Sequence, residues 1–138
     1  MNWRRQAIYG GLALLLVSPI VAPQLLAFPY SGQVGGHRVY SDYPIKPELV
    51  RIVSKADAVA EHSPIAIAVE NQPIFLTNGG WRWKLLALSS RGGFALSRTL
   101  IETIVVNRSS AAQDRVFNGA PIAGERSLSG VLAHELTH

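Results

Sequence analysis

A long uncharged run near the amino terminus is the feature that most limits how this chain of 138 residues can fold. Residues 7–28 contain no charged side chain, and no acidic residue precedes Asp42. Arg4 and Arg5 stand just before the run. A helix that crosses a bilayer needs about 20 mainly apolar residues, and this run is long enough. We therefore expect residues 1–28 to form a transmembrane helix that stands apart from the folded domain.

The charges around this run predict its orientation. Basic residues stay on the cytoplasmic side of a membrane, so Arg4 and Arg5 would hold the amino terminus there, with Trp3 as an interfacial anchor. Residues 29–138 would then form an exported domain on the periplasmic side of a single-pass membrane protein. A signal peptide cleaved after Ala27 is the competing interpretation, but the residues before that bond fit the cleavage pattern only loosely. A buried helix of a soluble core is the least expected alternative.

The composition of the chain suits one compact α+β domain after this segment. Hydrophobic residues make up 48% of the sequence and charged residues 16%, which argues against disorder. Cysteine is absent, so the chain has no disulfide framework and no thiol nucleophile. The net charge is +4, but apart from Arg4 and Arg5 near the amino terminus the basic residues are scattered singly. No nucleic-acid partner is expected, because a phosphate backbone is bound by a continuous basic surface.

The exported part begins with signals for a hairpin and a helix. Gly35 and Gly36 stand between two short strand-like runs, residues 30–34 and 37–41, and glycine pairs suit tight hairpin turns. Pro47 then starts a segment whose apolar residues recur at helical spacing to about residue 62.

Strand-like runs follow, at residues 65–69, 73–76, 81–88, 94–96 and 100–106. They predict a sheet of about three to five strands, mostly antiparallel because the connections are too short for crossover helices. In the third run Trp81 and Trp83 would share one face of a half-buried strand, alternating with Arg82 and Lys84. Residues 107–123 are polar and predict an exposed connection.

The end of the chain carries the strongest chemical signal. His134 and His138 are four residues apart, so on a helix both imidazoles point from the same face and can bind one zinc ion. Glu135 follows the first histidine and could act as the general base toward zinc-bound water. Ser127 or Ser129 could cap this helix. Its apolar stripe of Leu128, Val131, Leu132 and Leu136 would pack against the sheet.

The sequence from Val131 to His138 resembles the zinc-binding HExxH helix of zincin-type metallopeptidases, most closely the gluzincin type. The order of helix, sheet and helix is similar to the first half of a zincin catalytic domain. The resemblance implies a zinc-dependent peptidase that acts on a peptide or protein, with His134 and His138 as ligands and Glu135 as the catalytic base. The family's third ligand follows the motif, so we expect this chain to be an inactive fragment that stops before that ligand.

Other candidates for a third ligand precede the motif, and none is assigned. They are His37, Glu61, His62, Glu102, Asp114 and Glu125. An alternative function is a non-catalytic envelope-anchored binding or structural protein in which the motif is incidental. A basic nucleic-acid-binding module is a third and weaker alternative.

Overall fold

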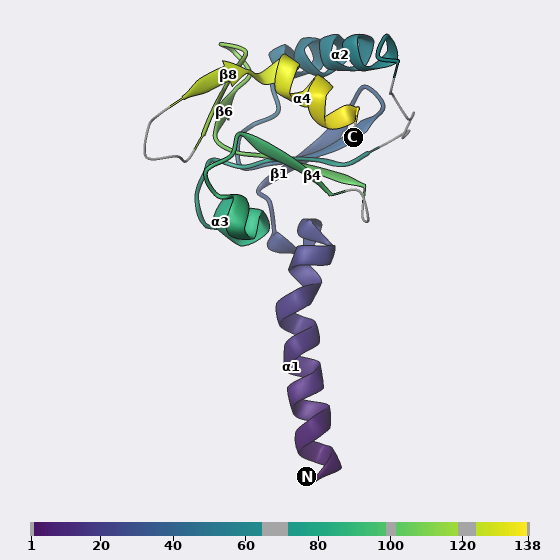
Figure 1. The fold of residues 1–138 in the computed structure, drawn as a ribbon, viewed down its shortest axis with the longest axis vertical. Coiled ribbons are helices and arrows are strands. Elements are labelled where there is room, and N and C mark those ends of the chain that lie inside the picture. Colours follow the sequence, from purple (N-terminus) through teal and green to yellow (C-terminus); the bar gives the residue numbers. More distant parts are fainter. Residues whose placement is uncertain (1, 65–71, 99–101, 119–123, 138) are drawn as a thin grey trace.

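The computed structural model describes residues 2–64, 72–98, 102–118 and 124–137. The helices of this part are α1 (Trp3–Val21), α2 (Pro47–Glu61), α3 (Trp81–Ala87) and α4 (Leu128–Leu136), with short 3-10 helices η1 (Pro23–Leu26) and η2 (Leu88–Ser90). The strands are β1 (Tyr30–Val34), β2 (His37–Ser41), β3 (Ile74–Leu76), β4 (Ala95–Arg98), β5 (Thr103–Val106), β6 (Ser109–Ser110), β7 (Arg115–Phe117) and β8 (Glu125–Ser127). Helix α1 projects from the rest of the molecule as a stalk (Figure 1).

The main sheet has five strands in the order β1-β2-β3-β5-β4. The outer pairs β1–β2 and β4–β5 are antiparallel, whereas β2–β3 and β3–β5 are parallel. The predicted mostly antiparallel sheet is therefore wrong, and the fold is mixed α/β. The physical reason is that α2 lies between β2 and β3 in the chain and provides the crossover that parallel neighbours need.

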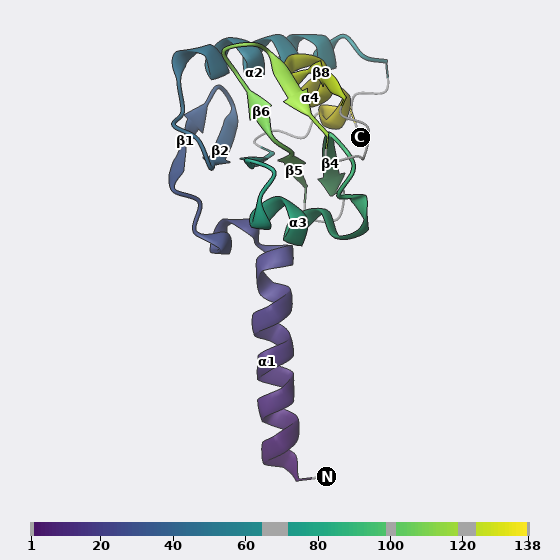
Figure 2. The ribbon, with the colours of Figure 1, turned by 90° about the vertical axis from the view of Figure 1, so that its left-hand side faces the viewer.

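Helices cover both faces of this sheet (Figures 1 and 2). On one face α2 and α4 pack against each other, and Ile74 and Leu76 of β3 join their apolar residues in one buried cluster. On the other face Phe75 joins Trp83 and Leu86 of α3. Adjacent residues of β3 thus belong to opposite clusters, as the alternation of a strand requires.

Two early elements agree with the sequence prediction. Strands β1 and β2 form the expected hairpin, in which Val34 pairs with His37 across a turn where Gly35 has φ of 56°. Glycine suits that left-handed conformation because it has no Cβ. Helix α2 begins at Pro47 and ends one residue before the predicted end.

The segment predicted as the third strand is helix α3 instead. Trp83, Leu86 and Ala87 are buried at helical spacing, whereas Trp81 is 57% exposed. The two tryptophans therefore do not share a face. The indole Nε1 of Trp83 donates a hydrogen bond to the Arg91 carbonyl at 3.0 Å, which satisfies the polar atom of this buried side chain.

The prediction of an exposed connection at residues 107–123 is wrong in part, because β6 and β7 lie in this range and belong to a second sheet. Strands β6, β7 and β8 form an antiparallel sheet in that order, so this part of the chain is not simply an exposed connection. Val116 of β7 is fully buried and belongs to the cluster beneath α4. The predicted strand at residues 65–69 lies outside the described residues.

The predicted transmembrane helix is wrong. Helix α1 ends at Val21, and the chain continues as the separate 3-10 helix η1. The uncharged part of α1, residues 6–21, is about 24 Å long at 1.5 Å per residue, whereas a bilayer core is about 30 Å thick. No helix in the described part of the chain is long and apolar enough to cross a membrane. The same finding contradicts the predicted location, which was a single-pass membrane protein with a periplasmic domain.

Arg82 joins the segment after α1 to the domain through one ion pair and two hydrogen bonds to backbone carbonyls. Arg82 of α3 contacts Asp42 through Nη1 and Oδ1 at 2.6 Å, and the Asp42 side chain is only 3% exposed. The same guanidinium donates hydrogen bonds to the carbonyls of Leu26 at 2.9 Å and Ala27 at 3.0 Å. Asp42 also accepts a hydrogen bond from the Asn78 backbone amide at 3.0 Å. The Arg82–Asp42 pair thus connects α3, the residue after β2 and the segment after α1.

We predict that Asp42→Asn lowers the free energy of unfolding by about 3 kcal/mol, because it leaves the Arg82 cation without its buried counter-ion. Urea unfolding followed by tryptophan fluorescence measures this loss. The matched control is Glu125→Gln, which removes an exposed ion pair with Arg115 at 3.9 Å and is expected to change stability by less than about 1 kcal/mol. Equal effects of the two substitutions would contradict the prediction.

Candidate functional site

Helix α4 carries the predicted motif, and its start is defined by a side-chain cap. Ser127 is the N-cap residue, one of the two predicted, and its hydroxyl accepts a hydrogen bond from the Gly130 amide at 3.1 Å. Leu128 and Leu132 are fully buried, and Val131 is 9% exposed. The predicted apolar stripe therefore holds α4 on the sheet.

Asp114 anchors the same end of α4. Its carboxylate accepts hydrogen bonds from the Ser129 amide at 2.7 Å, the Ser129 hydroxyl at 2.8 Å and the Ser127 hydroxyl at 3.2 Å. Lys55 of α2 lies 3.8 Å from the same carboxylate. A negative charge at a helix amino terminus is also favoured by the helix dipole. Asp114 therefore fixes where α4, and the motif on it, begins.

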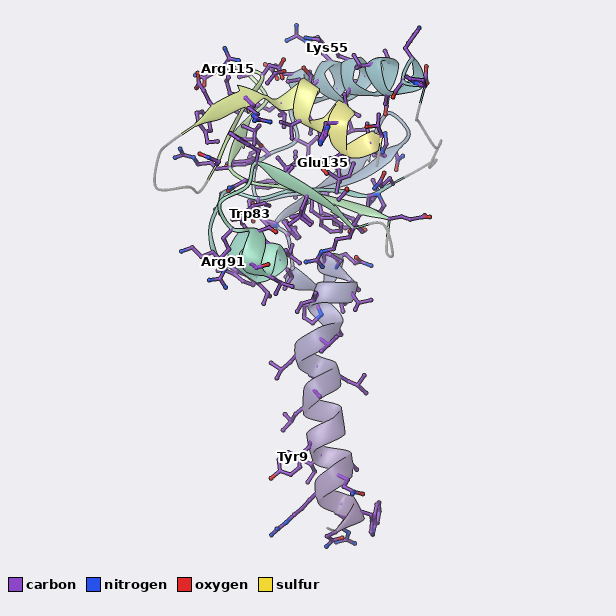
Figure 3. All side chains as sticks on the ribbon, viewed as in Figure 1. Tyr9, Lys55, Trp83, Arg91, Arg115 and Glu135 are labelled. Atoms are coloured by element: carbon purple, nitrogen blue, oxygen red, sulfur yellow. The ribbon has the colours of Figure 1, made fainter. Side chains whose placement is uncertain are left out.

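The first two motif residues line one cleft. His134 and Glu135 form part of the wall of a cleft of about 520 Å³, together with Gly130 and Val131 of the same helix. His134 is exposed, whereas Glu135 is only 9% exposed. Figure 3 shows Glu135 on the side of α4 that faces the sheet. His138, the second predicted ligand, lies outside the described residues.

Another part of the cleft wall lies at the edge of the main sheet. Phe94 and Ala95 line it, and Ala95 is the first residue of β4, the last strand in the sheet order. Strand β4 pairs with β5 on one side only, within the described part of the chain. An edge strand offers backbone N–H and C=O groups to which an extended peptide can add as a further strand. The cleft thus borders the start of the edge strand β4, the end of β8 and the motif helix.

Asp114 and Glu125, two of the upstream ligand candidates, have other interactions in the structure. Asp114 caps α4, and Glu125 faces Arg115 at 3.9 Å. Glu102 is exposed and has φ of 49° in a turn before β5.

Both upstream histidines also have hydrogen-bond partners outside the motif helix. His37 is buried, with Nε2 2.7 Å from Asp57 and Nδ1 2.8 Å from the Gln72 carbonyl. Nδ1 of His62, at the end of α2, lies 2.6 Å from the Ala58 carbonyl. Glu61 is exposed beside it. Among the described residues, no group of three or more histidine, cysteine, aspartate or glutamate side chains could hold a metal ion.

Sequence reasoning missed two residues of the cleft, Arg126 and Phe94. The guanidinium carbon of Arg126 lies 4.9 Å from the centre of the Phe94 ring, and both side chains line the cleft. They are far apart in the chain and share no motif, so only the packing of α4 against both β4 and β8 brings them together. No local sequence pattern could have revealed this pair.

The anchoring of α4 by Asp114 predicts a dependence of stability on pH. Partial burial raises the pKa of Asp114, but hydrogen bonds from Ser129 and Ser127 and the charge of Lys55 outweigh burial and lower it. A lowered folded-state pKa gives stability that is present above the unfolded value of about 3.9 and is lost as the pH falls through the folded-state value.

We predict that Asp114→Asn lowers the free energy of unfolding by about 1–2 kcal/mol at pH 7, because the charged acceptor at the start of α4 is lost. The difference from the native chain should shrink as the pH falls below about 4. Urea unfolding at a series of pH values measures both effects. A constant difference down to pH 2 would show that the charge of Asp114 is not the cause.

Comparison with protein-family models, with curated protein sequences and with solved structures finds no match to this chain.

Proposed function

We propose that this chain provides the histidine and glutamate part of a zinc-dependent peptidase site, with His134 and His138 as metal ligands and Glu135 as general base. The substrate is a peptide or protein that lies in the cleft between β4 and α4. The observation that carries the proposal is that His134 and Glu135 line the same cleft, which the start of edge strand β4 also borders.

The residues present suit this chemistry. Imidazole is a usual ligand of zinc, and a carboxylate next to it in sequence can reach a water molecule held at the metal. Glu135 is 9% exposed while it lines the cleft, so its carboxylate is partly shielded from bulk water. Such shielding strengthens its electrostatic interactions with groups bound in the cleft.

The proposed roles follow from these positions. Bound zinc would supply a Lewis acid and lower the pKa of a coordinated water to about 7. Glu135 would take the proton from that water and later deliver it to the leaving amine. The backbone of β4 would hold the peptide extended beside α4. A catalytic zinc site has three protein ligands, so the proposal requires one more in addition to the two histidines.

The first test is the zinc content of the full-length product of the gene. We predict that His134→Ala removes most of the bound zinc, because it deletes one of the protein ligands. Metal analysis after dialysis measures the stoichiometry. The matched control is His62→Ala, which removes an exposed histidine at the end of α2 and is expected to leave the zinc content unchanged. Zinc at the native stoichiometry in His134→Ala would exclude this residue as a ligand.

The second test separates catalysis from metal binding. Glu135→Gln should keep zinc and lose peptide hydrolysis by about a hundredfold or more, because an amide cannot accept the proton. Hydrolysis of an unstructured protein such as casein measures the activity. Native activity in Glu135→Gln would contradict the assigned role. Stable peptide binding without zinc or hydrolysis would instead favour a non-catalytic binding protein.

A further inference from the structure

The cleft contains a cationic side chain that the proposed chemistry does not use. Arg126 is the middle residue of β8 and lines the cleft together with His134 and Glu135. Its guanidinium lies against the Phe94 ring at 4.9 Å. The aromatic face favours a cation at this place, and an exposed contact of this kind contributes about 0.5–1 kcal/mol.

The charge of Arg126 is not neutralised by an ion pair within the described part of the chain. Glu125 faces Arg115, and Asp114 is bound by the serines at the start of α4 and by Lys55. Glu135 lines the same cleft and forms no ion pair with Arg126 among the described residues. Arg126 is exposed, so its N–H groups remain accessible to a ligand in the cleft. A guanidinium presents paired donors that match the two oxygens of a carboxylate.

The position of Arg126 predicts where along a bound peptide such a carboxylate would lie. Arg126 directly precedes the N-cap of α4, and His134 lies seven residues after that cap. At 1.5 Å per helical residue this separation is about 10 Å. An extended peptide advances about 3.3 Å per residue, so the same separation corresponds to about three peptide residues.

We propose that Arg126 binds a carboxylate of the substrate peptide, about three residues from the bond that is cleaved. This inference rests on the proposed peptidase function and adds a preference for acidic peptides. The carboxylate is either an aspartate or glutamate side chain or the carboxyl terminus of the peptide, since both present the same two oxygens. Arg126 is thus a specificity-determining residue.

The test measures peptide binding separately from hydrolysis, with the full-length product of the gene. Fluorescently labelled alanine-rich octapeptides carry one glutamate at each position in turn and have an amidated carboxyl terminus. A second set has no glutamate and a free carboxyl terminus. Fluorescence anisotropy gives the Kd of each peptide, and mass spectrometry identifies the cleaved bond. The variants are Arg126→Gln and Arg126→Lys.

The matched control is Arg108→Gln. Arg108 is also exposed and lies over an aromatic ring, Phe117, at 4.8 Å, but it does not line the cleft. We expect the best acidic peptide to bind about tenfold more tightly than the neutral amidated peptide, because a hydrogen bond to a charged group is stronger than one between neutral groups. Arg126→Gln should abolish that difference, Arg126→Lys should keep part of it, and Arg108→Gln should leave it unchanged.

The outcomes distinguish this inference from the peptidase proposal. Hydrolysis with no preference between acidic and neutral peptides would overturn the role of Arg126 and leave the peptidase intact. An Arg126-dependent preference in Kd without hydrolysis would overturn the peptidase and support the carboxylate site. A preference for glutamate peptides identifies a side chain as the ligand, and a preference for free carboxyl termini identifies the chain end. A preference that survives in Arg126→Gln would contradict the inference.

Discussion

The burial of the two central strands on both faces is the constraint on which the rest of this structure depends. Every residue of β3 and β5 is buried. A strand that is apolar on both sides must be covered by further layers above and below it. Helices α2 and α4 provide one layer, and α3 with η1 provides the other. The position of the motif helix is therefore a consequence of how the sheet is covered.

This constraint also explains which elements could be predicted from the sequence. The hairpin at Gly35, helix α2 and the cap of α4 depend on local signals, namely a turn residue, helical spacing and a serine. Helix α3 has no such local signal, because Trp81 and Trp83 alternate with Arg82 and Lys84 as strand residues do. Its helical state follows from the burial of Trp83 and Leu86 against the second face of the sheet. Tertiary packing overrides local preference in such short segments.

The amino-terminal segment shows the limit of an argument from composition. Residues 7–28 are uncharged, but composition does not reveal that the helix ends at Val21 and that η1 turns the chain toward the domain. In the structure Leu26 packs beside Phe75 and Trp83, and Arg82 holds the carbonyls that follow α1. The last part of the uncharged run therefore belongs to the core of the domain, which shortens the continuous apolar helix.

The candidate site was predictable only where its residues are adjacent in sequence. His134 and Glu135 follow each other, and consecutive helical residues point about 100° apart. One side chain can therefore be exposed while its neighbour is buried toward the sheet, and both still border the same cleft. Two other cleft residues come from separate parts of the chain, Phe94 from just before β4 and Arg126 from β8, and only the fold brings them together. Since Asp114 fixes the start of α4, it also determines how far along the cleft His134 lies from Arg126. The distance between the proposed reacting group and the proposed specificity group is thus determined by the anchoring of one helix.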